Sequence, residues 1–149
     1  MKLKNIIIII GIIAIIIIGC LVFTSQSNQI NIGSTHFKVP DGYNIKENND
    51  TINLTNNKDS IILMKHTKKN LNKTVEEYMN SKNNTNNSVQ LSKINIDNIT
   101  VYKVTVNNST TTHYWFEKNN NVYEFYTWST TPNTDIIVNE LIKSSNSII

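Results

Sequence analysis

An apolar segment without a single charge runs from Ile6 to Phe23 and limits what the rest of the chain can be. As a helix, its 18 residues would span about 27 Å, which is close to the thickness of the hydrocarbon core of a membrane. Lys2 and Lys4 precede it, so the positive-inside rule places the N-terminus in the cytoplasm and the following residues outside. The remaining chain must therefore build its own fold on the far side of a membrane.

Three fates of this segment fit the sequence, and they differ at Cys20. It stays as an uncleaved anchor, ends as a lipoprotein signal at Cys20, or is removed by simple cleavage. The stretch "IIGC" resembles a lipobox, with the small Gly19 before Cys20, but "LVF" continues the apolar run where a mature lipoprotein turns polar. A pilin-like signal is disfavoured because "MKLKN" offers no processing site before the helix. All three fates place the domain outside the cytoplasm.

The chain divides into four parts. We expect a cytoplasmic stretch at residues 1–5, the anchor or signal segment at 6–23, a polar linker at 24–29 and one extracytoplasmic domain at 30–149. About 120 residues are enough for a single domain with its own core. Cys20 is the only cysteine, so an intrachain disulfide and a cysteine-ligated metal are both excluded.

The charges argue against a nucleic-acid partner. The chain has 14 lysines and no arginine against 11 acidic residues, and two of those lysines precede the apolar segment, which leaves 12 against 11. Proteins that bind nucleic acid usually show a clustered, often arginine-rich basic surface. No such cluster occurs here, so we expect a membrane and an envelope partner but no nucleic acid.

Alternating apolar and polar residues predict β-strands through most of the domain. Residues 30–39 form two short strand pieces about Gly33 and Ser34, and "PDGY" forms a turn. "YNIKE" and "TINLT" form a hairpin, and the nearly all-apolar "SIILMKH" indicates a central strand. Four more strands with asparagine-rich turns follow between residues 89 and 128.

Two segments change to helical spacing. In "KTVEEYMNSKNN", Thr74 and Glu77 form a capping box, and Val75, Tyr78 and Met79 share one face. Near the C-terminus, the same spacing brings together Ile137, Val138, Leu141 and Ile142, with Asn133 or Thr134 as the cap. The expected fold is α+β, with a single antiparallel sheet of about six or seven strands and two helices packed on it, preceded by one N-terminal transmembrane helix.

The segment "HFKVPDGYNI" resembles the opening of PsbP-like domains, in which proline closes a strand and a turn leads to an aromatic residue. The residues that carry the resemblance are Phe37, Val39, Pro40, Gly42 and Tyr43, and the order of elements extends it over residues 30–145. The family includes photosystem accessory proteins and many membrane-tethered or lipoprotein domains. The resemblance implies a small, non-enzymatic domain and carries no catalytic residues over to this chain.

Aromatic residues gather on the last two predicted strands, "HYWFE" and "VYEFYTW". Because side chains alternate along a strand, both faces of this hairpin carry aromatic rings. One interpretation covers each face with a helix. The other leaves one face partly open, as a groove that binds a peptide, a glycan or an apolar ligand. The candidate groove residues are Tyr114, Trp115, Tyr126 and Trp128.

Motifs for catalysis and metal binding are missing from the sequence. His36, His66 and His113 lie on separate predicted strands without metal-ligand spacing, and we interpret them as ordinary surface or edge residues. There is no nucleophile elbow, phosphate loop or dinucleotide fingerprint. We therefore expect no enzymatic activity, no cofactor and no metal.

The expected function is that of a non-catalytic, membrane-anchored extracytoplasmic domain that binds or scaffolds another envelope component, either a protein or a glycan. One alternative is a small-ligand or metal-binding protein that uses the aromatic hairpin and His113. A second alternative is a hydrolase whose site no motif reveals.

Overall fold

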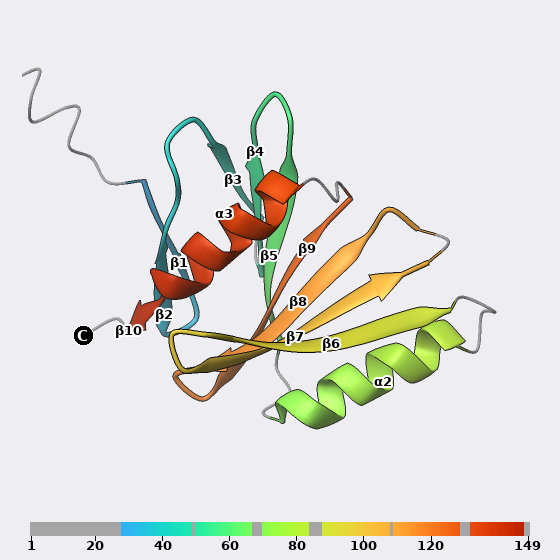
Figure 1. The fold of residues 1–149 in the computed structure, drawn as a ribbon. Coiled ribbons are helices and arrows are strands. Elements are labelled where there is room, and N and C mark those ends of the chain that lie inside the picture. The colour runs from blue at the N-terminus through green and yellow to red at the C-terminus, as the bar shows by residue number, and fades with distance from the viewer. Residues whose placement is uncertain are drawn as a thin grey trace, which may run out of the picture.

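The computed structural model describes residues 28–48, 50–66, 70–83, 88–107, 109–128 and 132–147. Their strands form two antiparallel sheets, and two helices pack against the larger sheet (Figure 1). The expected α+β class, the sheet of about seven strands and both helices are confirmed. The predictions for the transmembrane segment, the lipidation of Cys20 and most of the linker fall on residues 1–27, which lie outside the described residues.

The larger sheet has seven strands in the order β3-β4-β5-β9-β8-β7-β6. All neighbours are antiparallel. The strands are β3 (Asn44–Asn48), β4 (Thr51–Thr55), β5 (Ser60–His66), β6 (Val89–Ile96), β7 (Ile99–Val106), β8 (Thr112–Lys118) and β9 (Asn121–Thr127). The apolar β5 is an interior strand, as its sequence predicts, and β3 and β6 form the two edges.

Asparagine-containing turns connect the hairpins of this sheet. Asp97 and Asn98 between β6 and β7 both have positive φ, and so do Asn119 and Asn120 between β8 and β9. Positive φ at both central residues gives a two-residue turn whose twist matches that of the strands it joins. Asparagine and aspartate tolerate this conformation better than most residues, which explains why the asparagine-rich stretches predict these hairpins correctly.

The structure contains a second, smaller sheet, whereas the sequence predicts a single sheet. β1 (Gln29–Ile32) and β2 (Thr35–Lys38) form a hairpin about Gly33 and Ser34, and β10 (Asn146–Ser147) pairs with the free edge of β2. The hairpin is tied to the larger sheet through the buried hydroxyl of Tyr123, which donates to the backbone carbonyl of Ile32 (3.1 Å) and to Thr35 (2.9 Å). These contacts attach the hairpin to the face of the larger sheet rather than to its edge.

Both helices begin earlier than the sequence predicts. α2 (Leu71–Asn83) is capped by Asn70, whose side-chain oxygen accepts the backbone N–H of Lys73 at 2.9 Å. The capping box at Thr74 is therefore wrong: Thr74 lies inside the helix and donates to the carbonyl of Asn70. α3 runs over Pro132–Lys143, so its start also precedes the predicted caps. Neither helix has the length and apolar character that a membrane span needs.

The two helices cover opposite faces of the larger sheet (Figure 1). α3 and the small sheet pack against one face, called the α3 face here, where Phe37 meets the rings of Phe116, Tyr123 and Phe125 edge-on. α2 packs against the other, called the α2 face, where Val75 meets the smaller cluster around Trp115. The predicted apolar stripes of both helices are confirmed as their packed sides.

Candidate functional site

The four residues predicted to line a ligand groove are divided between the two faces of the β8–β9 hairpin. Tyr114 faces α3 and is 2% exposed, whereas Trp115 faces α2 and is 3% exposed. Tyr126 is half-buried, and Trp128, just beyond the end of β9, is 51% exposed. The structure brings Tyr126 and Trp128 together, with 5.3 Å between ring centroids, and leaves Tyr114 and Trp115 in separate parts of the core. The predicted ligand groove stays a prediction.

An open area of the α2 face lies beside Tyr126 and Trp128. In register, Tyr126 neighbours Ile62 on β5, which neighbours Asn53 on β4. α2 packs over β6, β7 and β8, so among the described residues no helix covers this face on β3, β4 and β5 (Figure 1). We call this area the aromatic platform and define it by Thr51, Asn53, Met64, Tyr126 and Trp128. It combines one exposed and one half-buried ring with amide and hydroxyl groups.

A chain of polar side chains crosses the border between the aromatic platform and α2. Glu124 on β9 is 5% exposed, and its carboxylate meets His113 Nδ1 at 2.5 Å and His66 Nε2 at 2.8 Å. The other nitrogen of His113, Nε2, lies 2.7 Å from the hydroxyl of Tyr78 on α2. Four side chains from β5, β8, β9 and α2 are thus connected in one hydrogen-bonded row, which links the helix to the sheet.

The hydrogen-bond partners assign the protons in this row. A carboxylate only accepts, so His113 donates to Glu124 through Nδ1, and in a neutral imidazole Nε2 then accepts from the hydroxyl of Tyr78. Burial alone would raise the pKa of Glu124, but the hydrogen bonds from His113 and His66 outweigh it and lower the pKa. Burial, together with the charge of Glu124, raises the pKa of Tyr78 to about 12. The row therefore holds a buried carboxylate and a neutral phenol.

This row was not predicted from the sequence. The interpretation of His113 as an ordinary surface or edge residue is wrong, because its side chain is buried against Glu124. A signal was present: in "VYEFY" the acidic residue occupies the same side of the strand as Val122 and Tyr126. An acid at such a position needs a buried partner, and histidine on a neighbouring strand is one way to supply it.

The histidines do not assemble a metal site. His66 and His113 share Glu124, whereas His36 lies on β2 in the other sheet. Among the residues that the structure describes, no group of three or more histidine, cysteine, aspartate or glutamate side chains is arranged to hold a metal ion. The two imidazoles that share a carboxylate instead act as its hydrogen-bond donors.

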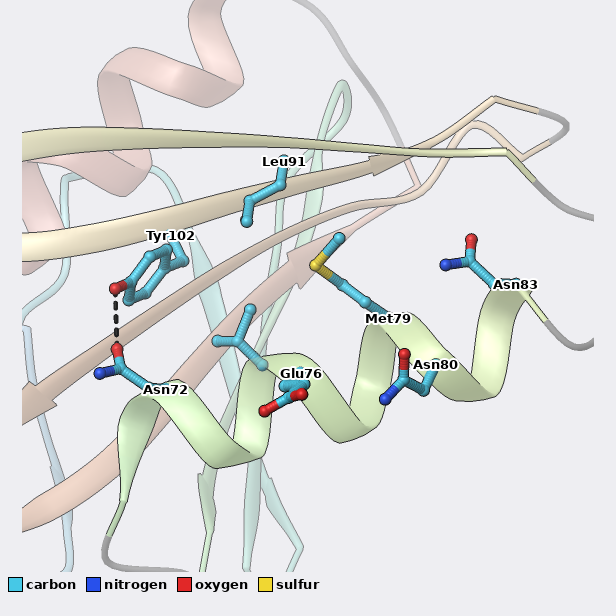
Figure 2. Close-up of a pocket in the computed structure, with 8 residues that line it drawn as sticks. Asn72, Glu76, Met79, Asn80, Asn83, Leu91 and Tyr102 are labelled. Carbon is cyan, nitrogen blue, oxygen red and sulfur yellow. Dashed lines mark hydrogen bonds between the residues drawn. The ribbon is translucent and has the colours of Figure 1, made fainter.

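A groove of about 300 Å³ separates α2 from strands β6 and β7 (Figure 2). Met79 on α2 and Leu91 on β6 extend toward each other across it, and the ring of Tyr102 closes one end. Leu91 is 42% exposed and lies on the lining of this groove. The residues that line the groove are Asn72, Val75, Glu76, Met79, Asn80, Asn83, Leu91 and Tyr102.

The groove has an apolar interior and a polar rim. Val75, Met79 and Leu91 supply the apolar surface, and the polar lining residues on successive turns of α2 are Asn72, Glu76, Asn80 and Asn83. The hydroxyl of Tyr102 donates to Asn72 at 2.7 Å, which fixes the ring and the amide at that end of the groove (Figure 2). An apolar depression with fixed polar groups around it is the usual chemistry of a binding site.

Comparisons with known proteins give information about the fold but none about the function. No family model and no curated protein matches the chain. Its structure is similar to a crystal structure of a protein from Bacteroides thetaiotaomicron, with a TM-score of 0.55 and 9% sequence identity. The similarity covers 83% of this chain and 50% of that one, so this chain spans about half the length of its structural neighbour. At this identity, the likeness shows the fold alone.

Proposed function

We propose that this chain is a non-catalytic, membrane-anchored extracytoplasmic domain that binds another envelope component in the groove between α2 and β6. The observation that carries the proposal is Leu91, which is 42% exposed at the mouth of an apolar groove. Covering the exposed part of a leucine is worth about 1 kcal/mol, and the apolar walls of Val75 and Met79 add to it. A partner that fills the groove gains this free energy without any rearrangement of the sheet.

The proposed anchor is the segment 6–23, with residues 24–29 as the linker. Six residues separate Phe23 from Ile30, so these two residues lie at most about 25 Å apart when the linker is fully extended. A domain on such a short tether stays close to the membrane surface, so its partner is a component found there. The order of the elements and the segment from Phe37 to Tyr43 support the further proposal that the domain is PsbP-like.

The mode of attachment is tested at Cys20. If the uncleaved helix is the anchor, Cys20→Ser leaves the protein in the membrane fraction with an unchanged mass, and the wild type takes up no lipid label. Lipid labelling of the wild type that is lost in Cys20→Ser, together with altered processing, would show a lipoprotein instead. Release of the wild-type domain into the soluble fraction would show simple cleavage and would contradict the anchor.

The binding proposal is tested by site-specific crosslinking in native membranes. A photo-crosslinking amino acid replaces Leu91 in the groove, and the matched control replaces Ile136, which is 53% exposed on α3. We expect position 91 to form an adduct with a discrete envelope component and position 136 to form none. Equal labelling from both positions, or recovery of the protein alone, would contradict the proposal.

The aromatic platform supports a second candidate function, the binding of a small ligand or a glycan. Exposed Trp128 beside Tyr126 is the observation in its favour, because aromatic rings offer flat apolar surface and the neighbouring Asn53 offers hydrogen bonds. Titration of soluble envelope glycan fragments into the protein tests it through tryptophan emission. A saturable change that disappears in Trp128→Phe supports glycan binding, and an unchanged spectrum counts against it.

A further inference from the structure

The edge strand β6 has backbone groups that no strand satisfies within the described residues. β6 pairs only with β7 among those strands, and Ile96 and Ile99 close the two-residue turn. In such a turn the closing residues exchange hydrogen bonds, and the pattern alternates along the strand. The backbone N–H of Asn107 donates to the carbonyl of Ser88 at 2.9 Å, which extends the same alternation to the other end of β6.

This alternation identifies the backbone groups that face outward. Even-numbered residues of β6 exchange hydrogen bonds with β7, so Leu91, Lys93 and Asn95 point their N–H and C=O groups away from the sheet. The side chains of the same three residues lie on the α2 face, because Ile94 and Ile96 pack into the core on the α3 face. The free backbone groups and the groove therefore belong to the same residues.

We propose that the groove partner binds as an added strand, an extended peptide segment that pairs with β6 and becomes the eighth strand of the sheet. This proposal rests on the proposed function and specifies its partner. An extended main chain repeats N–H and C=O groups at the spacing that Leu91, Lys93 and Asn95 present. Every second side chain of the segment then lies on the α2 face, where an apolar residue beside Leu91 enters the groove.

The single charge on β6 favours an acidic segment. Glu76 lines the groove and Glu117 lines the depression that Lys93 shares, so the carboxylate of the segment belongs beside Lys93 rather than beside Leu91. β6 carries Lys93, which is exposed and lies with its ammonium 5.8 Å from the ring of Tyr102, and it carries no acidic residue. A carboxylate beside Lys93 forms a favourable cross-strand pair, whereas like charges on neighbouring strands repel. Pairing between two copies of β6 would bring two lysines together without an acid, so a second copy of this chain fits the edge less well.

The opposite edge of the sheet lacks these features. β3 has only five residues, all exposed, and it carries both Lys46 and Glu47. Among the described residues, no helix packs beside it on the α2 face. Edge strands of this short, charged kind resist the addition of further strands. The two edges therefore provide an internal comparison.

The test is amide hydrogen exchange on the full chain in detergent micelles. The probe is a synthetic eight-residue peptide of threonines with one leucine and one glutamate two positions apart. At about 1 mM peptide, we expect exchange at Leu91, Lys93 and Asn95 to slow at least about tenfold, while Ile94, already paired with β7, stays unchanged. A peptide with lysine in place of glutamate is the matched control and should protect these amides less.

Two variants separate main-chain pairing from side-chain contact. Lys93→Pro removes an outward N–H without removing a bond to β7, so the sheet tolerates it while strand addition is lost. Lys93→Glu keeps the N–H and should reverse the preference to the lysine peptide. Circular dichroism shows whether both variants fold. If Lys93→Pro does not fold, the exchange pattern of the wild-type protein still tests the proposal.

Three results would overturn the strand-addition proposal. One is unchanged exchange at Leu91, Lys93 and Asn95 at the highest peptide concentration. Another is protection that grows with protein concentration in the absence of peptide, which would show pairing between copies. The third is equal peptide binding by folded Lys93→Pro and wild type. If crosslinking at position 91 still captures an envelope component in these cases, groove binding stands and only the strand mode fails.

Discussion

Glu124 illustrates at the scale of one residue how a charge is kept inside this domain. An ionised carboxylate without partners costs several kcal/mol to bury. Here the imidazoles of His113 and His66 each donate one hydrogen bond to it, and the pKa of Glu124 is lowered in spite of its burial. The carboxylate thus stays ionised at neutral pH, and the two histidines are positioned by it rather than by a ligand.

Replacing Glu124 tests the strength of this arrangement. Glu124→Gln keeps the shape but turns one of the two acceptor atoms into a donor, which faces a donating imidazole. We expect the free energy of unfolding to fall by about 2 kcal/mol at neutral pH, measured by urea denaturation of the full chain in detergent. Glu117→Gln, at an exposed carboxylate on neighbouring β8, is the control and should change stability by less than about 0.5 kcal/mol. Equal effects would contradict the prediction.

The same carboxylate predicts a pH dependence. Its pKa is lower in the folded state than the ordinary value of 4.5, so the unfolded chain takes up a proton first as the pH falls. The stability that Glu124 provides is complete above about pH 4.5 and is lost as the pH drops below it toward the folded pKa. Wild-type stability should therefore decline more steeply than that of Glu124→Gln in this range. Parallel curves would argue against a lowered pKa.

Two glycines with positive φ form a matched pair for backbone strain. Gly33 and Gly42 have φ of +62° and +86°, so alanine is strained at either position by about 1 kcal/mol. A Cβ at Gly42 meets nothing within 4 Å, whereas at Gly33 it lies 2.6 Å from Lys65 Cδ and 3.2 Å from the hydroxyl of Tyr123. We expect Gly33→Ala to cost about 2 kcal/mol and Gly42→Ala about 1 kcal/mol by urea denaturation. Equal losses in the free energy of unfolding would mean that Lys65 and the hydroxyl of Tyr123 move away from the added methyl group at no cost.

At the scale of elements, the sequence predicts what depends on neighbouring residues. Alternation identifies strands such as β4 and β5, because each side chain on such a strand faces either the core or the opposite side. The start of α2 was misplaced for a physical reason. Thr74 and Glu77 have capping-box spacing, but Asn70 comes earlier in the chain, and its side chain caps the helix there. Local patterns therefore predict the existence of elements better than their ends.

Removing the cap of α2 tests this explanation. Asn70→Ala leaves the backbone N–H of Lys73 without its side-chain acceptor, and we expect a loss of about 1 kcal/mol in the free energy of unfolding. The control is Asn80→Ala, at an exposed position within the helix, where alanine favours the helix and stability should be unchanged or slightly higher. Chemical denaturation followed by circular dichroism measures both. An unchanged free energy of unfolding in Asn70→Ala would contradict this explanation and favour Thr74 as the cap.

At the scale of the whole molecule, the order of the strands in the sheet could not be predicted from the sequence. β5 and β9 are neighbours although they are far apart in the chain, and this pairing brings His66 onto Glu124. β10 is only two residues long and gains its position from backbone bonds to β2. Such contacts depend on which surfaces meet after the chain has folded. The groove beside Leu91 has the same origin, since α2 and β6 form it together.

The two tryptophans provide a test of the whole arrangement, because they report opposite surroundings. Trp115 is buried beneath α2, and Trp128 is exposed at the edge of the aromatic platform. In Trp128→Phe the remaining indole should emit at short wavelength and resist quenching by acrylamide until the protein unfolds. In Trp115→Phe the remaining indole should emit at long wavelength and be quenched several-fold more strongly in the folded state. Similar spectra from the two variants would contradict the packing of α2 on the sheet, and with it the groove, because the same helix covers Trp115 and forms one wall beside Leu91.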